Sequence, residues 1–253
     1  MQVQLSAVII TFNEEKNIER CVLSAQKVAD EVLVVDSFST DDTKTICEKL
    51  GVRFIEHAFE GHIQQKNWAK SQAEFDYVLS LDADEALDEK LTQSILSVKN
   101  NWIANAHKVN RLTNYCGHWV RHTSWYPDTK IRLFDRRIGK WAGLNPHDEY
   151  KVPITETVPH LEGDILHYSF YTKAEHLLQI EKFSTIGAQA LLEKGSRSNL
   201  LKIIIKPLAR FVKNYIVRLG MLAGKAGWDI STLSAYANYL KYKKLSQLQK
   251  QGG

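Results

Sequence analysis

The chain has 253 residues, long enough for one large domain, or for one domain with a helical appendage, and for a substantial buried core. Apolar residues make up 44% and charged residues 25%, a composition that is typical of globular proteins and excludes a disordered chain. The three cysteines, Cys21, Cys47 and Cys116, are far apart and outside CxxC spacing, so the sequence predicts neither a disulfide framework nor a zinc site and fits a reducing cytosol.

The net charge of +4 is unevenly distributed along the chain. From Lys194 to the end there are twelve Lys and Arg residues and one acid, Asp229, so this tail carries +11 and the rest carries −7. Such a tail predicts a polyanionic partner, either nucleic acid or an anionic membrane. No segment approaches the roughly 18 consecutive apolar residues of a membrane-spanning helix. The apolar run 7–10 is not preceded by the basic segment that a signal peptide has. We therefore expect a cytoplasmic protein, peripheral on the inner face of the cytoplasmic membrane.

Strands and helices alternate in the first third of the chain. Apolar runs predict strands, and apolar residues at helical spacing predict helices between them. The expected strands are 5–11, 31–36, 52–55 and 77–81, and the expected helices are 14–27, a segment from the cluster 39–42 to about Gly51, and 61–74. This alternation predicts βαβ units, a mostly parallel sheet and the α/β fold class.

The later part of the chain divides into two stretches. Residues 101–168 are rich in Trp, His and Arg and contain short β-like pieces at 130–134 and 164–167. From Thr172 onward the pattern is helical, with interruptions near Gly195 and Gly227. We expect a catalytic domain over 1–170 and a helical C-terminal region over 171–253.

Acidic residues stand where three of the predicted strands end. They are Glu14, Asp36 and the cluster Asp82, Asp84 and Glu85. The carboxyl ends of parallel strands gather at one edge of a sheet, where ligands bind, so these acids are expected to face one crevice. For a single acid, capping of the next helix is an equally good interpretation.

Asp82-Ala83-Asp84 places two carboxylates two residues apart after an apolar strand. If the backbone stays extended, both point to the same side and share a hard cation such as Mg²⁺ or Mn²⁺, which would neutralise a departing diphosphate. Glycine-rich phosphate loops are absent from the sequence. A D-x-D pair also arises by chance, so its position after a strand carries the prediction.

These motifs together resemble family 2 of the inverting glycosyltransferases, which have the GT-A fold. The closer resemblance is to the bacterial branch that adds a sugar to the lipopolysaccharide core. It implies a nucleotide diphosphate sugar donor, with UDP-glucose as the default, and a glycolipid acceptor. The segments that carry the resemblance are 8–14 (VIITFNE), 34–37 (VVDS) with Thr40 and Asp41, 67–69 (NWA), 79–85 (LSLDADE), 130–134 (KIRLF), 139–141 (GKW), 146–148 (PHD), 166–169 (LHYS) and the basic tail.

The resemblance also implies roles for single residues. The Thr11 backbone and Glu14 would hold the nucleoside, and Asp36 would accept from the base N–H. Asp82 would lie near the ribose, and Asp84 would bind the metal. Arg132 and His167 are weaker candidates for contact with the diphosphate or the metal. His167 has the alternative of a core histidine whose hydrogen bonds are satisfied. Lys66 has the alternative of a solvated surface charge. The other residues expected at the nucleotide are Asn13, Ser37, Lys66 and Ala83.

Inverting transfer needs a carboxylate that takes the proton of the acceptor hydroxyl. The segment His147-Asp148-Glu149, after an expected turn at 145–146, offers two. Relatives commonly carry Glu directly after this histidine, and here that position is Asp148. If 147–150 is extended, Asp148 and Glu149 point to opposite sides, and we favour Asp148 as the base. The alternative is that both acids only order a loop.

The basic tail contains a candidate membrane-binding stripe. Lys202, Lys206, Arg210 and Lys213 follow one another at helical spacing beside apolar residues, so the segment can lie on anionic lipid. A solvated face of a helix packed on the catalytic domain is the plainer alternative. Two other functions stay open on sequence alone: a nucleotidyltransferase and a basic nucleic-acid-binding module. We expect no nucleic-acid partner. The sequence predicts no oligomeric state, and it does not specify the sugar or the linkage.

Overall fold

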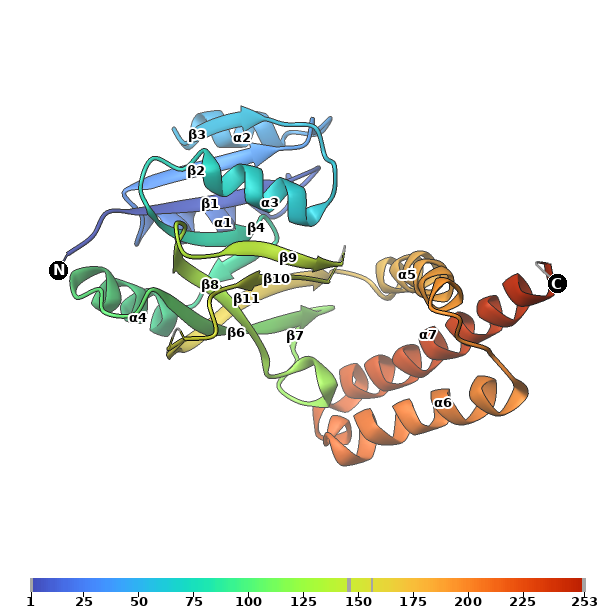
Figure 1. Cartoon of the computed structure of the whole chain (residues 1–253). Coiled ribbons are helices and arrows are strands. Elements are labelled where there is room, and N and C mark those ends of the chain that lie inside the picture. Colours follow the sequence, from blue (N-terminus) through green and yellow to red (C-terminus); the bar gives the residue numbers. More distant parts are fainter. Residues whose placement is uncertain (1, 145–146, 156, 252–253) are drawn as a thin grey trace. The chain divides into compact units, whose positions relative to one another are not determined.

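The computed structural model describes residues 2–144, 147–155 and 157–251 (Figure 1). Its contacts divide the chain into two compact units. The first is Met1–Arg111 with Asp128–Tyr168, and the second is Leu112–Pro127 with Ser169–Gly253. The second unit therefore combines the helical C-terminal region with a short segment from the middle of the chain.

Four parallel strands form the first part of the sheet, in the order β3-β2-β1-β4. Parallel strands covered on both faces are apolar throughout, which is why the runs 5–11 and 31–36 were recognisable in the sequence. The strands are β1 (Leu5–Thr11), β2 (Glu31–Asp36), β3 (Arg53–Glu56) and β4 (Tyr77–Asp82), and the helices that connect them are α1 (Ile18–Gln26), α2 (Thr43–Lys49) and α3 (His62–Ser71).

The sheet continues past β4 with strands from the middle of the chain, in the order β4-β8-β6-β11-β5. The pairs β4·β8, β6·β8 and β5·β11 are antiparallel. Residues 101–168, read from the sequence as two short β pieces, thus hold most of the second half of the sheet. The elements are β5 (Glu85–Leu87), α4 (Glu89–Asn100), β6 (Ala106–Tyr115), β7 (His118–Trp119), β8 (Asp128–Asp135), β11 (His160–Phe170) and the separate hairpin β9 (Lys140–Leu144) and β10 (His147–Lys151).

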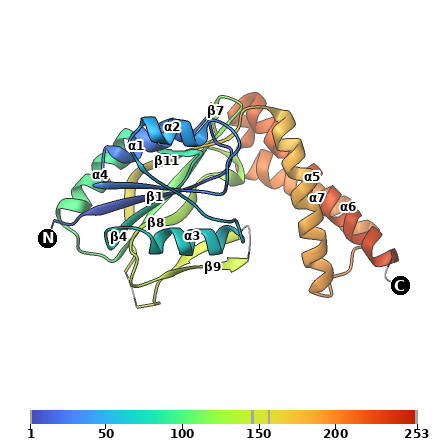
Figure 2. The same cartoon turned by 90° about the horizontal axis from the view of Figure 1, so that it is seen from above.

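Two apolar clusters cover the two faces of the sheet in the first unit (Figure 2). On one face, α1, α2 and α4 pack on alternate residues of β1 such as Leu5 and Ile9. On the other, α3 and the β9–β10 hairpin pack through Ala69, Trp141 and Tyr150. The α/β fold class is confirmed.

Three long helices dominate the second unit: α5 (Lys173–Glu193), α6 (Leu200–Val212) and α7 (Gly224–Gln251). A capping box between Thr172 and Glu175 begins α5. The predicted interruption near Gly195 is confirmed. The second interruption also exists, but it lies at 218–223, shortly before Gly227, because α7 begins at Gly224. A Cβ atom at Gly227 would collide with the carbonyl oxygen of Gly220, so this glycine permits a close approach of two backbones.

Short turns complete the second unit. They are the 3₁₀ turns Thr123–Trp125 and Gly220–Ala223 and the π turn Lys213–Val217. Pro207 lies inside α6. Within the described residues, no helix combines the length and apolarity needed to cross a membrane.

Candidate active site

The carboxyl ends of β1, β2 and β4 lie at the same edge of the sheet. Thr11 pairs with Asp36, and Ile10 pairs with Asp82, so the three strand ends are level. The parallel topology thus brings together the acidic positions that are separated in the sequence.

The loops after β1 and β2 are tied to one another. Asn13 adopts a left-handed backbone conformation (φ 54°), and its N–H donates to Ser39 Oγ at 2.8 Å. The Asn13 side-chain oxygen accepts from the N–H of Thr40 at 2.8 Å, and Ser37 N–H donates to the Thr11 carbonyl at 3.0 Å. The predicted nucleotide residues Thr11, Asn13 and Ser37 therefore form one loop pair at the edge of the sheet.

Asp36 is buried at the end of β2, and its carboxylate accepts from the backbone N–H of Ser39 at 2.7 Å. Glu14 accepts from Asn17 Nδ2 at 2.7 Å. Burial raises the pKa of Glu14 to about 7, and the negative charge of Asp84 adds to this effect. The carboxylates of Glu14 and Asp84 therefore repel each other at the strand ends.

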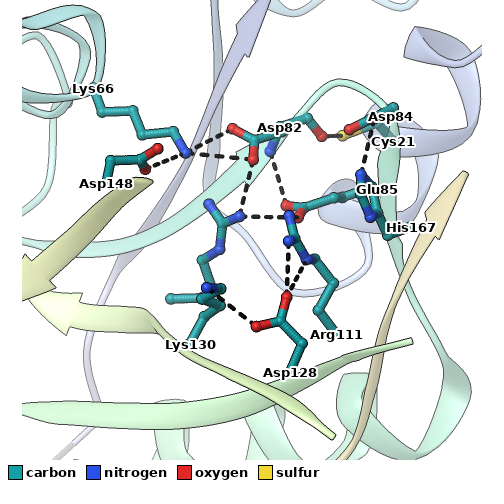
Figure 3. A network of polar contacts seen from close by, with 11 residues as sticks. Cys21, Lys66, Asp82, Asp84, Glu85, Arg111, Asp128, Lys130, Asp148 and His167 are labelled. Carbon is teal, nitrogen blue, oxygen red and sulfur yellow. Dashed lines mark hydrogen bonds and ion pairs between the residues drawn. The ribbon is translucent and has the colours of Figure 1, made fainter. Parts of the chain in front are cut away.

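The D-x-D segment does not continue as a strand. β4 ends at Asp82, residues 83–84 form a turn, and β5 begins at Glu85. The Ala83 N–H donates to the Ile10 carbonyl at 3.1 Å, which fixes this turn against β1. The extended backbone assumed for the pair is wrong, and the two carboxylates have different partners (Figure 3).

Asp82 binds two buried cations. Lys66 Nζ lies 2.9 Å from its Oδ1, and Arg132 Nη2 lies 2.9 Å from its Oδ2. Although burial opposes ionisation, these two cations hold the pKa of Asp82 well below its usual range. The side chains of Lys66 and Arg132 are only 4% and 3% exposed, so the alternative of a solvated charge at Lys66 is wrong.

Asp84 faces His167, which lies on β11. Asp84 Oδ2 and His167 Nε2 are 3.1 Å apart, and the Tyr168 N–H donates to the Asp84 carbonyl at 2.8 Å. Burial opposes the ionisation of Asp84, but the interaction with His167 outweighs burial and lowers the pKa of Asp84. His167 is therefore neither in the apolar core nor remote from the acids.

The donor set of this pair suits a divalent cation. A carboxylate and an imidazole are both ligands of divalent metals, and two protein ligands leave positions for phosphate oxygens and water. Among the residues that the structure describes, His, Cys, Asp and Glu side chains do not gather in groups of three or more that could hold a metal. The chemistry of Asp84 and His167 is therefore compatible with a divalent metal.

Asp148 and Glu149 lie on the extended strand β10 and point to different surroundings. Asp148 Oδ2 is 2.8 Å from Lys66 Nζ, and its side chain is 12% exposed. Glu149 pairs with Lys151, its side chain is 60% exposed, and the hydrogen bond to Lys151 holds its pKa below the usual value. The turn expected at 145–146, and with it Pro146 of the matching motif, lies outside the described residues.

A cavity of about 740 Å³ lies beside these groups in the first unit. Asp82, Asp148 and Trp141 line it, and the Lys66 ammonium stands 4.7 Å from the centre of the Trp141 ring. All the lining residues are Lys66, Asp82, Lys108, Arg111, Thr129, Lys130, Ile131, Arg132, Trp141, Asp148, Glu149 and Tyr150.

Sequence reasoning assigned no role to three members of this network. Glu85 is fully buried and accepts from Arg132 Nη2 at 2.9 Å and from the Asp82 N–H at 3.0 Å. Arg111 binds Asp128 through two nitrogens, at 3.0 and 2.8 Å. Glu85 stood out only as one of several acids, and Arg111 and Asp128 gave no signal because they meet across a strand pair.

Comparison with known proteins identifies the class. Residues 6–151 match the model of glycosyl transferase family 2. An uncharacterised glycosyltransferase of Rickettsia typhi is 31% identical over 257 residues, which cover 97% of this chain and 87% of that protein. The lipopolysaccharide core biosynthesis glycosyltransferase LpsC of Rhizobium meliloti is 27% identical over 251 residues, covering 96% of this chain and 92% of its own.

Among solved structures, fragment 1–349 of S. aureus TarS in complex with UDP-GlcNAc matches 98% of this chain and 92% of its own at 17% identity, with a TM-score of 0.49. Glucosyl-3-phosphoglycerate synthase of Mycobacterium tuberculosis, in complex with Mn²⁺, UDP and glucosyl-3-phosphoglycerate, matches 44% of each chain at 21% identity, with a TM-score of 0.38. The sequence matches define the chain as a glycosyltransferase. It belongs to glycosyl transferase family 2.

Proposed function

We propose that this glycosyltransferase moves a sugar, by default glucose, from a UDP-sugar to a glycolipid acceptor of the lipopolysaccharide-core type, with inversion at the anomeric carbon. One observation carries the proposal: Lys66 binds both Asp82, at the end of β4, and Asp148, in the cavity. This contact joins the proposed donor side to the proposed proton acceptor. The name of the relative LpsC supports the class of acceptor.

The donor nucleoside would bind at the strand ends of β1 and β2. Thr11 and Glu14 would hold it, and Asp36 would accept from the N–H of the base. Phe12 directly follows β1 and is 56% exposed, which offers an aromatic face on which a base can stack. Asn13, Ser37 and Ala83 would shape this site through their backbone positions.

Asp84 and His167 would hold Mg²⁺ or Mn²⁺. When bound, the metal would stabilise the negative charge that develops on the departing diphosphate. Lys66 and Arg132 both bind the Asp82 carboxylate, so Asp82 is not free to bind the metal. In this position Asp82 would orient the ribose. Arg132 remains a candidate for contact with the anionic substrate.

Asp148 would act as the base. The acceptor hydroxyl oxygen forms a bond to the anomeric carbon, the bond from that carbon to the diphosphate oxygen breaks, and the hydroxyl proton passes to Asp148. Glu149 also lines the cavity, but its carboxylate is paired with Lys151 and is 60% exposed, so we assign it no proton transfer.

We further propose an anionic membrane surface as the partner of α6. No residue of α6 is buried, although the helix packs on α7. Its apolar residues are exposed together with basic ones, a combination that suits lipid better than nucleic acid, which offers no apolar interior. A peripheral position on the inner face of the cytoplasmic membrane would bring the enzyme to a glycolipid.

A donor screen tests this function directly. The protein is incubated with UDP-glucose, UDP-galactose and UDP-GlcNAc, with and without Mn²⁺, and the shift in unfolding temperature is measured. We expect stabilisation by one UDP-sugar, only with metal, and transfer of its labelled sugar to core-truncated lipopolysaccharide with inversion detected by NMR. Binding of nucleoside triphosphates in preference to UDP-sugars would contradict the proposal.

A further inference from the structure

Helix α3 contacts the β9–β10 hairpin, which carries Asp148, through several polar side chains (Figure 2). Lys66 Nζ binds Oδ2 of Asp148 at 2.8 Å. Lys70, one helical turn later, donates to the backbone carbonyl of Gly139, just before β9. Asn67 lies between these two lysines in the sequence and makes a further contact with the same hairpin.

The Asn67 side chain forms two hydrogen bonds with the backbone of a single residue of β9. Its Nδ2 donates to the Trp141 carbonyl at 2.8 Å, and its Oδ1 accepts from the Trp141 N–H at 3.0 Å. Trp141 pairs with Tyr150 of β10, but its backbone groups point toward α3, as expected for a pair that is not hydrogen-bonded across the two strands. The Asn67 amide therefore takes the place of a third strand at the outer edge of this two-stranded sheet.

The residue that Asn67 holds is buried. Trp141 is only 4% exposed, and its ring packs edge-on against Tyr150 and Phe134. Tyr150 stacks on Phe134 of β8, with the ring centres 3.6 Å apart. Buried backbone groups without hydrogen-bond partners are costly. Without the Asn67 amide, the hairpin would have to move to bring the Trp141 backbone to water.

The position of Trp141 also sets the position of Asp148. Asp148 and Tyr150 are two residues apart on an extended strand, so their side chains share one side of β10. Since Tyr150 is the partner of Trp141 across the hairpin, a shift of Trp141 also moves Asp148 relative to Lys66. A misplacement of about 1 Å can lower the rate of an enzyme by roughly 10²-fold.

We propose that Asn67 is a positioning residue, whose amide fixes the hairpin on α3 and so holds Asp148 where it accepts the proton. The inference rests on the proposed function, in which Asp148 is the base, and adds a residue that acts through it. The cavity lining does not include Asn67, so we assign it no contact with substrate. Helix α3 packs on the sheet through Ala69, so the contact of Lys66 with Asp82 on the donor side should persist when Asn67 is replaced.

A double-mutant cycle of Asn67→Ala and Asp148→Asn tests this role on the whole chain. The substrates are core-truncated lipopolysaccharide and UDP-glucose, or the UDP-sugar that the donor screen selects, with Mn²⁺. Asn67→Ala should lower kcat about 10- to 100-fold and change the donor affinity by less than about twofold. In the Asp148→Asn background the same substitution should cost less than about twofold, because the carboxylate that it positions is already replaced.

Two further variants and one spectroscopic measurement complete the test. Asn67→Asp keeps an acceptor for the Trp141 N–H and loses the donor to the Trp141 carbonyl, so its kcat should also fall at least about tenfold. The Trp141 amide, followed by NMR, should exchange with solvent at least about tenfold faster in Asn67→Ala. Asn100→Ala is the matched control: Asn100 is exposed at the end of α4 and does not line the cavity, so kcat and exchange should stay normal.

Several results would overturn the proposal. Normal kcat of both Asn67 variants beside an inactive Asp148→Asn would remove the positioning role and leave the base in place. Effects of Asn67→Ala and Asp148→Asn that multiply, or loss of donor affinity in both Asn67 variants, would indicate a purely structural role. Unchanged exchange of the Trp141 amide would show that Asn67 does not hold the hairpin. Near-normal turnover of Asp148→Asn would contradict the proposed function itself, and the role of Asn67 with it.

Discussion

The ammonium group of Lys66 lies 2.8 Å from Oδ2 of Asp148, so helix α3 holds the carboxylate that strand β10 presents to the cavity. The same ammonium lies 2.9 Å from Oδ1 of Asp82. A single buried lysine therefore sets the distance between the proposed base and the first acid of the D-x-D segment. Asp148 has a fixed position in the cavity, whereas Glu149 has a partner on the solvent side.

The base is tested by two neighbouring amide substitutions. Asp148→Asn keeps the size of the side chain and removes the proton acceptor, so turnover should fall by roughly 10²–10⁴-fold while donor affinity changes little. Glu149→Gln is the matched control and should cost far less. Steady-state rates and UDP-sugar titrations of both variants decide the assignment. Near-normal turnover of Asp148→Asn beside an inactive Glu149→Gln would reverse it, and loss of donor binding in Asp148→Asn would indicate a structural role.

The proposed metal site is tested by removing either proposed ligand. Asp84→Asn and His167→Gln should each weaken Mn²⁺ binding about tenfold or more, because each would remove one of the two proposed protein ligands. Mn²⁺ affinity is measured by electron paramagnetic resonance in the presence of UDP, and EDTA should abolish transfer by the unmodified enzyme. Asp42→Asn, an exposed acid at the start of α2, is the control and should bind Mn²⁺ normally. Full activity after EDTA treatment would show that the metal role is wrong.

The parallel half of the fold was predictable from sequence, because strands covered on both faces leave continuous apolar runs. Strands β1 and β2 begin and end at the predicted residues. The predicted β-like piece 130–134 lies inside β8, but the full extent of β8 and the whole of β6 were not predictable in the same way. Their cavity-lining positions carry Lys108, Arg111, Lys130 and Arg132, so charged residues interrupt the apolar pattern of buried strands.

The site was predictable where it depends on strand ends and unpredictable where it depends on distant contacts. Asp36 and Asp82 could be placed at one edge of the sheet from the βαβ pattern alone. The contact of Lys66 with Asp148 joins residues 82 positions apart, and no local pattern indicates it. The turn at 83–84 was missed because a two-residue spacing is compatible with either a strand or a turn.

Acid stability is expected to depend on His107. Burial of this side chain lowers its pKa from 6.5 to about 4 in the folded state. Between these values the unfolded chain binds a proton at His107 and the folded chain does not, so the free energy of unfolding falls as the pH falls from 6.5 to 4. The loss should reach about 3 kcal/mol from this group.

His107→Gln cannot ionise and should flatten this part of the pH profile. The comparison uses urea unfolding of both proteins at pH 7.5 and pH 4.5, and the relevant quantity is the difference between the two pH values, because the substitution itself also changes packing. An equally steep loss in both proteins would show that other groups control acid unfolding.

The membrane surface is the last prediction, and the structure changes which residues should carry it. The sequence indicated the stripe Lys202, Lys206, Arg210 and Lys213. In the structure, burial lowers the pKa of Lys241 on α7, and the positive charges of Arg210 and Lys206 lower it further. Part of the stripe therefore lies near α7. The exposed apolar residues of α6 offer a separate face. They are Leu200, Leu201, Ile204, Ile205, Leu208 and Val212.

Insertion of this face into lipid predicts a specific outcome for charge substitutions. The double variant Ile204→Glu with Leu208→Glu should lose at least about tenfold in binding to vesicles that contain anionic lipid, because each buried apolar side chain contributes about 1.5–3 kcal/mol. Lys206→Glu should have a smaller effect, of about 1 kcal/mol, because Lys206 lies near Lys241 of α7 and only its charge can act on anionic lipid. Leu178→Glu is the control, because Leu178 is 74% exposed on α5, outside this face. Sedimentation with anionic and neutral vesicles measures all four proteins. If the unmodified protein sediments equally with both vesicle types or with neither, or if Leu178→Glu is as defective as the α6 variant, α6 is a solvated helix and the surface proposal is wrong.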